Sequence, residues 1–256
     1  MEFFDTHAHY NDEKFDEDRD ALIKDIYNDS ITKMVTVGYD VESSRRAIEI
    51  AEKYEFMYAT CGISPNDVQN VDIETEISKI SALLPNKKVV AIGEIGLDYY
   101  WNKDNKDMQK EYFIKQIEIA NRFNLPIIIH SRDAINDTIE ILKQNNVNKK
   151  GIFHCCMQNE FLIKEALKLD FYISFAGAIT FKNAKHADEV IKLVPLERLL
   201  IETDSPYLAP EPKRGTRNDS RNVKYIAEKI ANVKQISIEQ VAKQTYENAM
   251  KIYGIK

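Results

Sequence analysis

The sequence is poor in the features that mark membrane proteins and disulfide-bonded secreted proteins. No run of about 18 residues is free of charge, which excludes a membrane-spanning helix. The N-terminal segment is acidic from Glu2 onward, so we expect no secretory signal. The only cysteines are Cys61, Cys155 and Cys156. An odd number with two adjacent argues against a disulfide framework and predicts a reducing, cytoplasmic location.

The 256-residue chain also lacks an excess of positive charge. Its 35 Lys and Arg residues are outnumbered by 41 Asp and Glu residues, which gives a formal net charge of −6 at pH 7. An acidic chain is not a general coat for nucleic acid, so any action on phosphate esters needs local positive charge from a metal or a few arginines. The absence of Gly-x-Ser-x-Gly, Walker-type and Gly-x-Gly-x-x-Gly motifs excludes the enzymes built on them.

What the sequence does contain is a regular alternation of apolar runs with amphipathic segments. Eight runs have strand character: Glu2–His7, Lys33–Gly38, Met57–Gly62, Val89–Glu94, Pro126–His130, Gly151–His154, Phe171–Phe175 and Leu199–Asp204. Their mean spacing of about 28 residues is close to that of an eight-fold β/α barrel. Several runs are apolar on both faces, which is typical of parallel strands covered on both sides. The sequence therefore predicts an α/β fold, a (β/α)8 TIM barrel.

The segments between these runs have the period of amphipathic helices. In Lys110–Phe123 and Val223–Val233 the apolar residues recur at positions i, i+3 and i+4. Ser43 is the expected N-cap of a helix over Ser44–Lys53. No linker rich in proline, glycine or serine interrupts the chain, so we expect one hydrolase domain over residues 1–256.

Four of the five histidines stand at the ends of predicted strands. His7 and His9 lie two residues apart, which on a strand lets both imidazoles reach one ion. His130 and His154 end the fifth and sixth runs, and active sites of this fold lie at the carboxyl ends of the strands. A single histidine there is usually structural, but four favour a shared site. His186 lies in a predicted polar helix over 182–193 and is expected to be solvated.

Carboxylates complete this set. Glu94 and Asp204 end the fourth and eighth runs, where a carboxylate is costly unless it is paired or bound to metal. Glu202 shares a predicted strand face with Asp204, and either residue could point inward, with Asp204 favoured by its place at the strand end. Asp5 is predicted to share the face of the first two histidines one layer deeper and to support one of them.

Four histidines and two carboxylates exceed the capacity of one tetrahedral ion and suit two divalent ions bridged by Glu94. The mixed nitrogen and oxygen donors permit zinc, manganese or magnesium. Asp204 is the candidate to orient the attacking water and accept its proton, so Glu94 and Asp204 are the predicted catalytic residues. The predicted metal ligands are His7, His9, Glu94, His130, His154 and Asp204.

Other side chains near the strand ends allow two interpretations each. Arg132 and Arg217 are the predicted phosphate-binding residues, whereas the neighbouring Lys213 and Arg214 fit a solvated basic turn equally well. The aromatic segment 99–101 either stacks on a base or caps the barrel mouth.

Cys155 follows His154 directly, which raises the alternative of a cysteine nucleophile. Adjacent strand residues point to opposite faces, so this pairing is poor. We therefore expect buried, inert thiols at Cys155 and Cys156.

Together these residues resemble the TatD family of metal-dependent deoxyribonucleases. The resemblance spans the whole chain and is carried by motifs in chain order. They are DTHAH (5–9), GEIGLDY (93–99), PIIIHSR (126–132), FHC (153–155), SFAG (174–177), ETDSPYL (202–208) and RGTRN (214–218).

The resemblance implies a barrel of the amidohydrolase type that hydrolyses DNA phosphodiesters, typically as a magnesium- or manganese-dependent exonuclease. It implies one metal held by His7, His9, Glu94 and Asp204, and another held by Glu94, His130 and His154. DNA would then be a transient substrate, and we expect no membrane and no stable protein partner.

The sequence departs from the usual pattern of this family in two segments. Ser64 stands in GISPN (62–66), where the family often has Gly-x-His-Pro-His, and segment 155–158 lacks the glycine of Cys-Phe-Ser-Gly. Both changes touch the barrel mouth, where they affect substrate preference and rate more than metal binding.

One alternative is an amidohydrolase for a small ester, amide or lactone, although such enzymes often bridge their metals with a carbamylated lysine where Glu94 stands. The other is a non-catalytic barrel that binds metal or nucleic acid.

Overall fold

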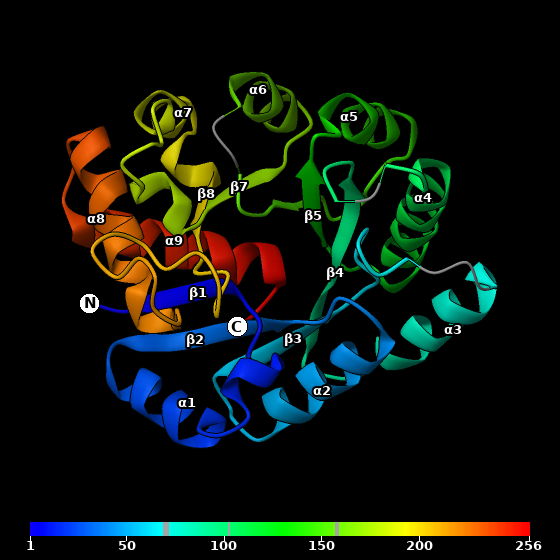
Figure 1. Ribbon diagram of the computed structural model, residues 1–256, viewed down its shortest axis with the longest axis horizontal. Coiled ribbons are helices and arrows are strands. Elements are labelled where there is room, and N and C mark those ends of the chain that lie inside the picture. The colour runs from blue at the N-terminus through cyan, green and yellow to red at the C-terminus, as the bar shows by residue number, and fades with distance from the viewer. Residues whose placement is uncertain (69–71, 102, 157–158) are drawn as a thin grey trace.

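Eight parallel strands form one sheet in which each strand pairs with the next along the chain (Figure 1). The computed structural model describes residues 1–68, 72–101, 103–156 and 159–256. The strands are β1 (Phe3–Ala8), β2 (Ile31–Val37), β3 (Met57–Cys61), β4 (Val89–Asp98), β5 (Ile127–Arg132), β6 (Gly151–Phe153), β7 (Tyr172–Phe175) and β8 (Leu199–Ile201). Strict alternation with helices and the nearly closed sheet confirm the predicted TIM barrel.

Helices follow the strands and surround the sheet (Figure 1). They are α1 (Arg19–Asn28), α2 (Val41–Glu52), α3 (Ile73–Leu83), α4 (Lys106–Phe123), α5 (Ile135–Gln144), α6 (Glu160–Lys168), α7 (Ala187–Leu193), α8 (Val223–Lys234) and α9 (Ile238–Tyr253). Within the described ranges, no helix combines the length and the apolar character needed to cross a bilayer.

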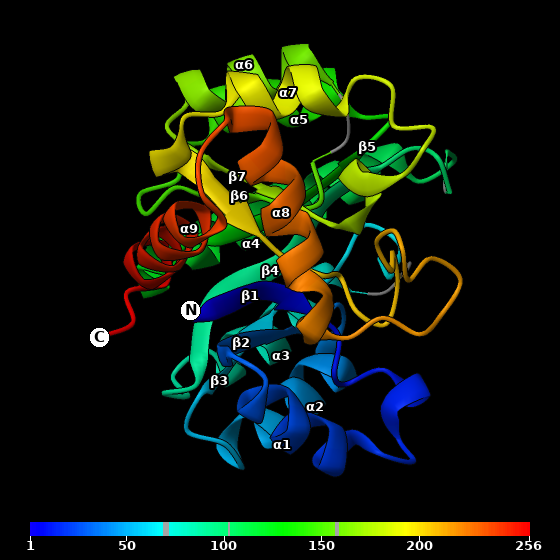
Figure 2. The same ribbon diagram turned by 90° about the vertical axis from the view of Figure 1, so that its left-hand side faces the viewer.

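The core has two apolar layers, because successive side chains of a strand point to opposite faces of the sheet. One layer packs the sheet against the surrounding helices. The other fills the barrel interior with residues such as Val90, Ile128 and Leu200, and Ala249 and Tyr253 of α9 pack against it. Figure 2 shows α9 and both termini on one side of the barrel and the long loop between β8 and α8 on the other. Helix α9 therefore packs against the barrel at the end opposite to the loop between β8 and α8.

The barrel closes between β1 and β8 through a few contacts rather than a full ladder. One parallel bridge joins Ala8 to Ser205, and the Asp204 N–H donates to the His7 carbonyl at 2.9 Å. β8 ends at Ile201, earlier than the predicted Asp204. The reason is local: the Thr203 N–H donates to the Asp5 carboxylate at 2.9 Å, and Asp204 has a left-handed backbone with φ of 56°.

Helix starts differ from the prediction at two places. The N-cap of α2 is Asp40, not Ser43, because the Asp40 carboxylate accepts from the Ser43 N–H while the Ser43 hydroxyl accepts from the Asp40 N–H. This is a capping box, in which Ser43 occupies the third helical position. The predicted helix over 182–193 is shorter and starts at Ala187, with His186 exposed and 2.8 Å from Glu189.

Gly96 is required by the close approach of β4 to β5. Its φ is +135°, and a Cβ at this position would lie 2.1 Å from the carbonyl oxygen of His130. We expect Gly96→Ala to lower the free energy of unfolding by about 3 kcal/mol or more, since backbone must move to relieve the clash. Gly215→Ala is the control, because Gly215 also has a positive φ but nothing lies within 4 Å of its would-be Cβ. Equal losses for both variants in urea unfolding would contradict the steric argument.

Candidate metal centre

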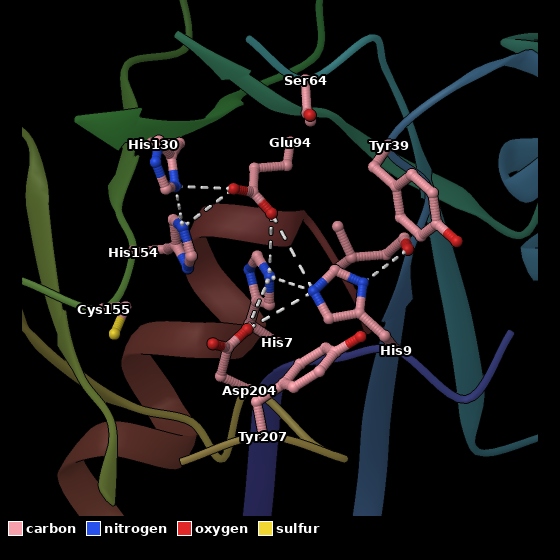
Figure 3. Close-up of polar contacts among 12 residues, drawn as sticks. His7, His9, Tyr39, Ser64, Glu94, His130, His154, Cys155, Asp204 and Tyr207 are labelled. Atoms are coloured by element: carbon pink, nitrogen blue, oxygen red, sulfur yellow. Dashed lines mark hydrogen bonds and ion pairs between the residues drawn. The ribbon is translucent and has the colours of Figure 1, made fainter. Parts of the chain in front are cut away.

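The structure brings all six predicted metal ligands together at the carboxyl ends of the strands (Figure 3). Their imidazoles and carboxylates fall into two neighbouring groups. The groups are in contact through His7 and His154, whose rings stack with their centroids 4.1 Å apart. The side chains are buried or nearly so, so each polar atom must find its partner within the group.

The first group joins β1 to the segment after β8. His7 Nε2 and His9 Nε2 lie 3.3 Å apart, and Asp204 Oδ1 lies 3.6 Å from the first and 3.4 Å from the second. Asp204 reaches this position because its own N–H is held by the His7 carbonyl. The contact that closes the barrel between β1 and the segment after β8 therefore also places Asp204 next to His7 and His9.

The second group joins β4, β5 and the end of β6. His130 Nδ1 and His154 Nε2 lie 2.8 and 3.2 Å from Glu94 Oε1, and 3.2 Å from each other. These three donor atoms lie close enough to share one cation.

Glu94 stands between the two groups. While Oε1 faces His130 and His154, Oε2 lies 3.5 Å from His7 Nε2 and 3.9 Å from His9 Nε2. Burial alone would raise the pKa of Glu94, but His154, His130 and His7 hold it well below its usual value. One ionised carboxylate thus offers an oxygen to each group, which is the arrangement a bridging ligand needs.

Contacts on the far side of three imidazoles set which nitrogen faces the centre. His9 Nδ1 lies 3.1 Å from the Val37 carbonyl, and His130 Nε2 lies 2.9 Å from Asp98 Oδ2. His154 Nδ1 lies 3.3 Å from Glu202 Oε1. At His9 and His130 a hydrogen bond on the outer nitrogen leaves the lone pair of the inner nitrogen directed at the centre, as in metal-binding histidines. The outer nitrogen of His154 makes no hydrogen bond within the part of the chain that the structure describes.

These donor atoms fit a metal better than they fit one another. Inner nitrogens face each other at 3.2–3.3 Å in both groups, so each pair needs a shared proton or a cation between its lone pairs. Burial lowers the pKa of His7, which favours its neutral imidazole. Burial has the same effect on His9, His130 and His154, but the neighbouring carboxylates outweigh it and raise their pKa values, so these imidazoles attract the positive charge that a metal would supply. The Nδ1 atom of His7 is buried and has no hydrogen-bond partner among the residues described.

Asp98 and Glu202 are two further carboxylates at this centre that the sequence prediction did not assign. Both are fully buried and each contacts a histidine of the second group. Asp98 lies four residues after Glu94 in β4, a same-face spacing that offered a usable signal. The sequence leaves Glu202 and Asp204 as alternatives, whereas the structure places both at the histidines. Asp204 Oδ1 lies 3.4 Å from the inner nitrogen of His9, and Glu202 Oε1 lies 3.3 Å from the outer nitrogen of His154.

Asp5 supports the main chain rather than an imidazole ring, which corrects the expected role. Its carboxylate accepts from the N–H and hydroxyl of Thr203, from the Ser220 hydroxyl and from the backbone N–H of His7. Burial raises the pKa of Asp5 to about 7, although the Ser220 and Thr203 hydrogen bonds oppose this shift. The β1–β2 register is irregular between Asp5 and Ala8, so simple alternation does not put Asp5 and His7 on one face.

The two predicted phosphate-binding arginines have different surroundings. Arg217 Nη1 lies 2.9 Å from Asp18 Oδ1 and also donates to the Lys14 carbonyl at 2.8 Å, so its guanidinium is already engaged. The Arg132 guanidinium lies 3.8 Å from the centroid of the Tyr100 ring. It makes no ion pair within the described chain.

The remaining residues at the mouth include the two family departures. Ser64 is buried and its hydroxyl donates to Asp67 at 2.5 Å. Burial raises the pKa of the Cys155 thiol well above its ordinary value, and the Cys155 N–H donates to Glu202 at 2.6 Å. Cys156 is buried, whereas residues 157–158 of the second departure lie outside the described residues.

The family model described as TatD related DNase matches residues 4–254. An uncharacterized metal-dependent hydrolase of Bacillus subtilis, YabD, is 46% identical over 98% of this chain and 99% of its own length. The Escherichia coli protein YcfH, with the same description, is 40% identical over 77% of this chain and 73% of its own.

A solved structure shows the same architecture. The crystal structure of YJJV, a TatD homolog from Escherichia coli, superposes with a TM-score of 0.93 at 25% identity, covering 99% of this chain and 98% of that one. The family match and the close relatives agree with the convergent donor groups. The chain therefore belongs to the TatD related DNase family and is a metal-dependent hydrolase of that family.

Proposed function

We propose that this chain is a deoxyribonuclease that hydrolyses phosphodiester bonds of DNA with two divalent cations, working on single strands or strand ends. The observation that carries the proposal is the position of Glu94, which offers one oxygen to each of two donor groups. DNA would be a transient substrate, since a net charge of −6 favours weak, salt-sensitive binding over tight coating of a duplex.

The two donor groups described above would each hold one divalent cation. His7, His9 and Asp204 would hold one cation, His130 and His154 the other, and Glu94 would bridge them. Bound divalent cations would polarise the phosphoryl oxygens and favour ionisation of the attacking water. Magnesium, manganese and zinc all suit the mixed donors.

Asp204 is the proposed acceptor of the water proton. Burial alone would raise its pKa, but hydrogen bonding from His9 and the charges of His7, His9 and His154 hold the pKa below its usual value. The carboxylate is therefore ionised at neutral pH and can accept a proton. As the water oxygen bonds to phosphorus, its proton passes to Asp204, the bond from phosphorus to the sugar oxygen breaks, and that oxygen takes a proton from solvent.

Arg132 is proposed to bind the phosphate, since its guanidinium has no competing carboxylate among the residues described. Arg217 would need to leave Asp18 to do the same, so its predicted role now requires a rearrangement. A cytoplasmic location stays a prediction, supported by three free cysteines.

The test is hydrolysis of end-labelled single-stranded DNA by metal-stripped protein, with Mg²⁺, Mn²⁺ or Zn²⁺ restored separately. We expect metal-dependent cleavage, and the product ladder from each label gives the polarity. Arg132→Ala should raise KM by about tenfold with a smaller change in kcat, because a charge-assisted contact to phosphate is lost. Arg45→Ala, on the exposed face of α2, is the matched control and should leave KM unchanged.

Two other results would redirect the proposal. Cleavage of small esters, amides or lactones without cleavage of DNA would identify a small-molecule amidohydrolase. Metal binding without hydrolysis of any of these substrates would support a non-catalytic barrel.

A further inference from the structure

An exposed aromatic turn follows β4 at the barrel mouth. Trp101 is the only tryptophan of the chain and is 68% exposed, while the adjacent Tyr100 is 49% exposed. The two rings meet edge to face with their centroids 4.8 Å apart. Aromatic residues that merely cap a core are expected to be buried, whereas these two exposed rings form one continuous aromatic surface that suits a ligand with a flat apolar face.

The turn is fixed to the metal centre through one carboxylate. Asp98 Oδ1 accepts from the backbone N–H groups of Tyr100 at 2.9 Å and Trp101 at 3.1 Å, while Oδ2 lies 2.9 Å from His130 Nε2. The side-chain amide of Gln109 holds both the N–H and the carbonyl of Asp98. A single carboxylate therefore separates the main chain of the aromatic turn from a proposed metal ligand.

The positively charged side chain of Arg132 lies beside these two rings. Arg132 lies opposite Asp98 in the backbone register of β4 and β5, and its guanidinium lies 3.8 Å from the centroid of Tyr100 and 5.5 Å from that of Trp101. Exposed rings beside a guanidinium complement a nucleotide, whose base stacks on aromatic rings and whose phosphate pairs with arginine. An aromatic ligand without an anionic group would leave the guanidinium unused.

We propose that Tyr100, Trp101 and Arg132 form a stacking platform that holds one unpaired nucleobase beside the scissile phosphate. The indole of Trp101 stacks on the base, while Arg132, seated on Tyr100, contacts the neighbouring phosphate. Inside a duplex both faces of a base are covered by neighbouring base pairs, so a base can stack on the indole only where it leaves that stack, and the platform favours single-stranded DNA over duplex. This inference rests on the proposed deoxyribonuclease function, and Trp101 acts in it as a substrate-binding residue.

The first test compares two substrates with the same phosphodiester backbone. With single-stranded oligo-dT, Trp101→Ala should raise KM by about tenfold and change kcat by no more than about threefold, whereas Trp101→Phe should stay near the unmodified protein. With an oligonucleotide of abasic residues, Trp101→Ala should leave KM unchanged. A structural defect would raise KM on both substrates. Tyr27→Ala removes a similarly exposed ring from α1 and is the matched control.

The second test does not depend on turnover. A non-cleavable phosphorothioate oligo-dT, titrated into the metal-loaded protein, should quench the fluorescence of Trp101, and the abasic analogue should not. Hydrolysis of DNA with neither quenching nor a base-dependent change in KM would overturn the platform and leave the nuclease proposal standing. Quenching without hydrolysis would support the platform and refute the nuclease proposal. The absence of both would refute both.

Discussion

Replacing Glu94 by glutamine is expected to lower DNA hydrolysis by a factor of about 10³ or more and to reduce the metal content of the chain. In Glu94, Oε1 lies 2.8 Å from His130 Nδ1 and Oε2 lies 3.5 Å from His7 Nε2, so each donor group receives one carboxylate oxygen. The amide keeps the size of the side chain but removes its negative charge and replaces one of these oxygens by an NH₂ group. Initial rates and metal analysis after dialysis would measure the two effects.

Glu160→Gln is the control for this prediction. Glu160 lies at the exposed start of α6, where it pairs with Lys164 on the outside of the barrel. This variant should retain full activity and metal content. If Glu94→Gln also remained fully active, a bridging role for Glu94 would be wrong, and the two groups would have to bind their metals independently.

Asp204→Asn should lower kcat by about 10²–10⁴, because the proposed proton acceptor is lost. The metal content should fall in part, since the amide weakens the group of His7 and His9 but leaves the group of Glu94, His130 and His154 intact. Steady-state kinetics at saturating DNA and metal analysis on the same preparation would separate the two effects.

Asp188→Asn is the matched control for Asp204→Asn. Asp188 lies in the first turn of α7 and pairs with Lys229 on the surface, so this substitution should leave kcat unchanged. An unchanged kcat for Asp204→Asn would exclude Asp204 as the proton acceptor and direct attention to another carboxylate of the centre.

The sequence predicted the fold well because the evidence for it is repetitive. Eight apolar runs with helical segments between them identify parallel strands, and each predicted run overlaps an observed strand. The ends of individual strands were predicted less accurately. β4 continues to Asp98, past the predicted end at Glu94, because its pairing with β5 resumes beyond an irregular register between Ile92 and Ile95.

Residue types and strand ends were enough to identify the six candidate ligands that the structure brings together, because histidines and carboxylates are unusual after continuous apolar runs. The same reasoning could not assign Asp98 and Glu202 to the outer nitrogens of His130 and His154, because such pairings depend on where neighbouring strands meet. Nor could it show that Arg217 pairs with Asp18, a residue far away in the sequence.

The sequence by itself therefore determined the barrel, the end of the barrel that carries the polar residues, and the chemical types of the candidate metal donors. Only the tertiary structure decided the direction of each donor. The irregular register between Asp5 and Ala8, the similar break before Ile95 and the left-handed backbone of Asp204 all lie at the centre. Regular alternation assigns faces only where pairing is regular, and each bulge or turn rotates the side chains that follow it.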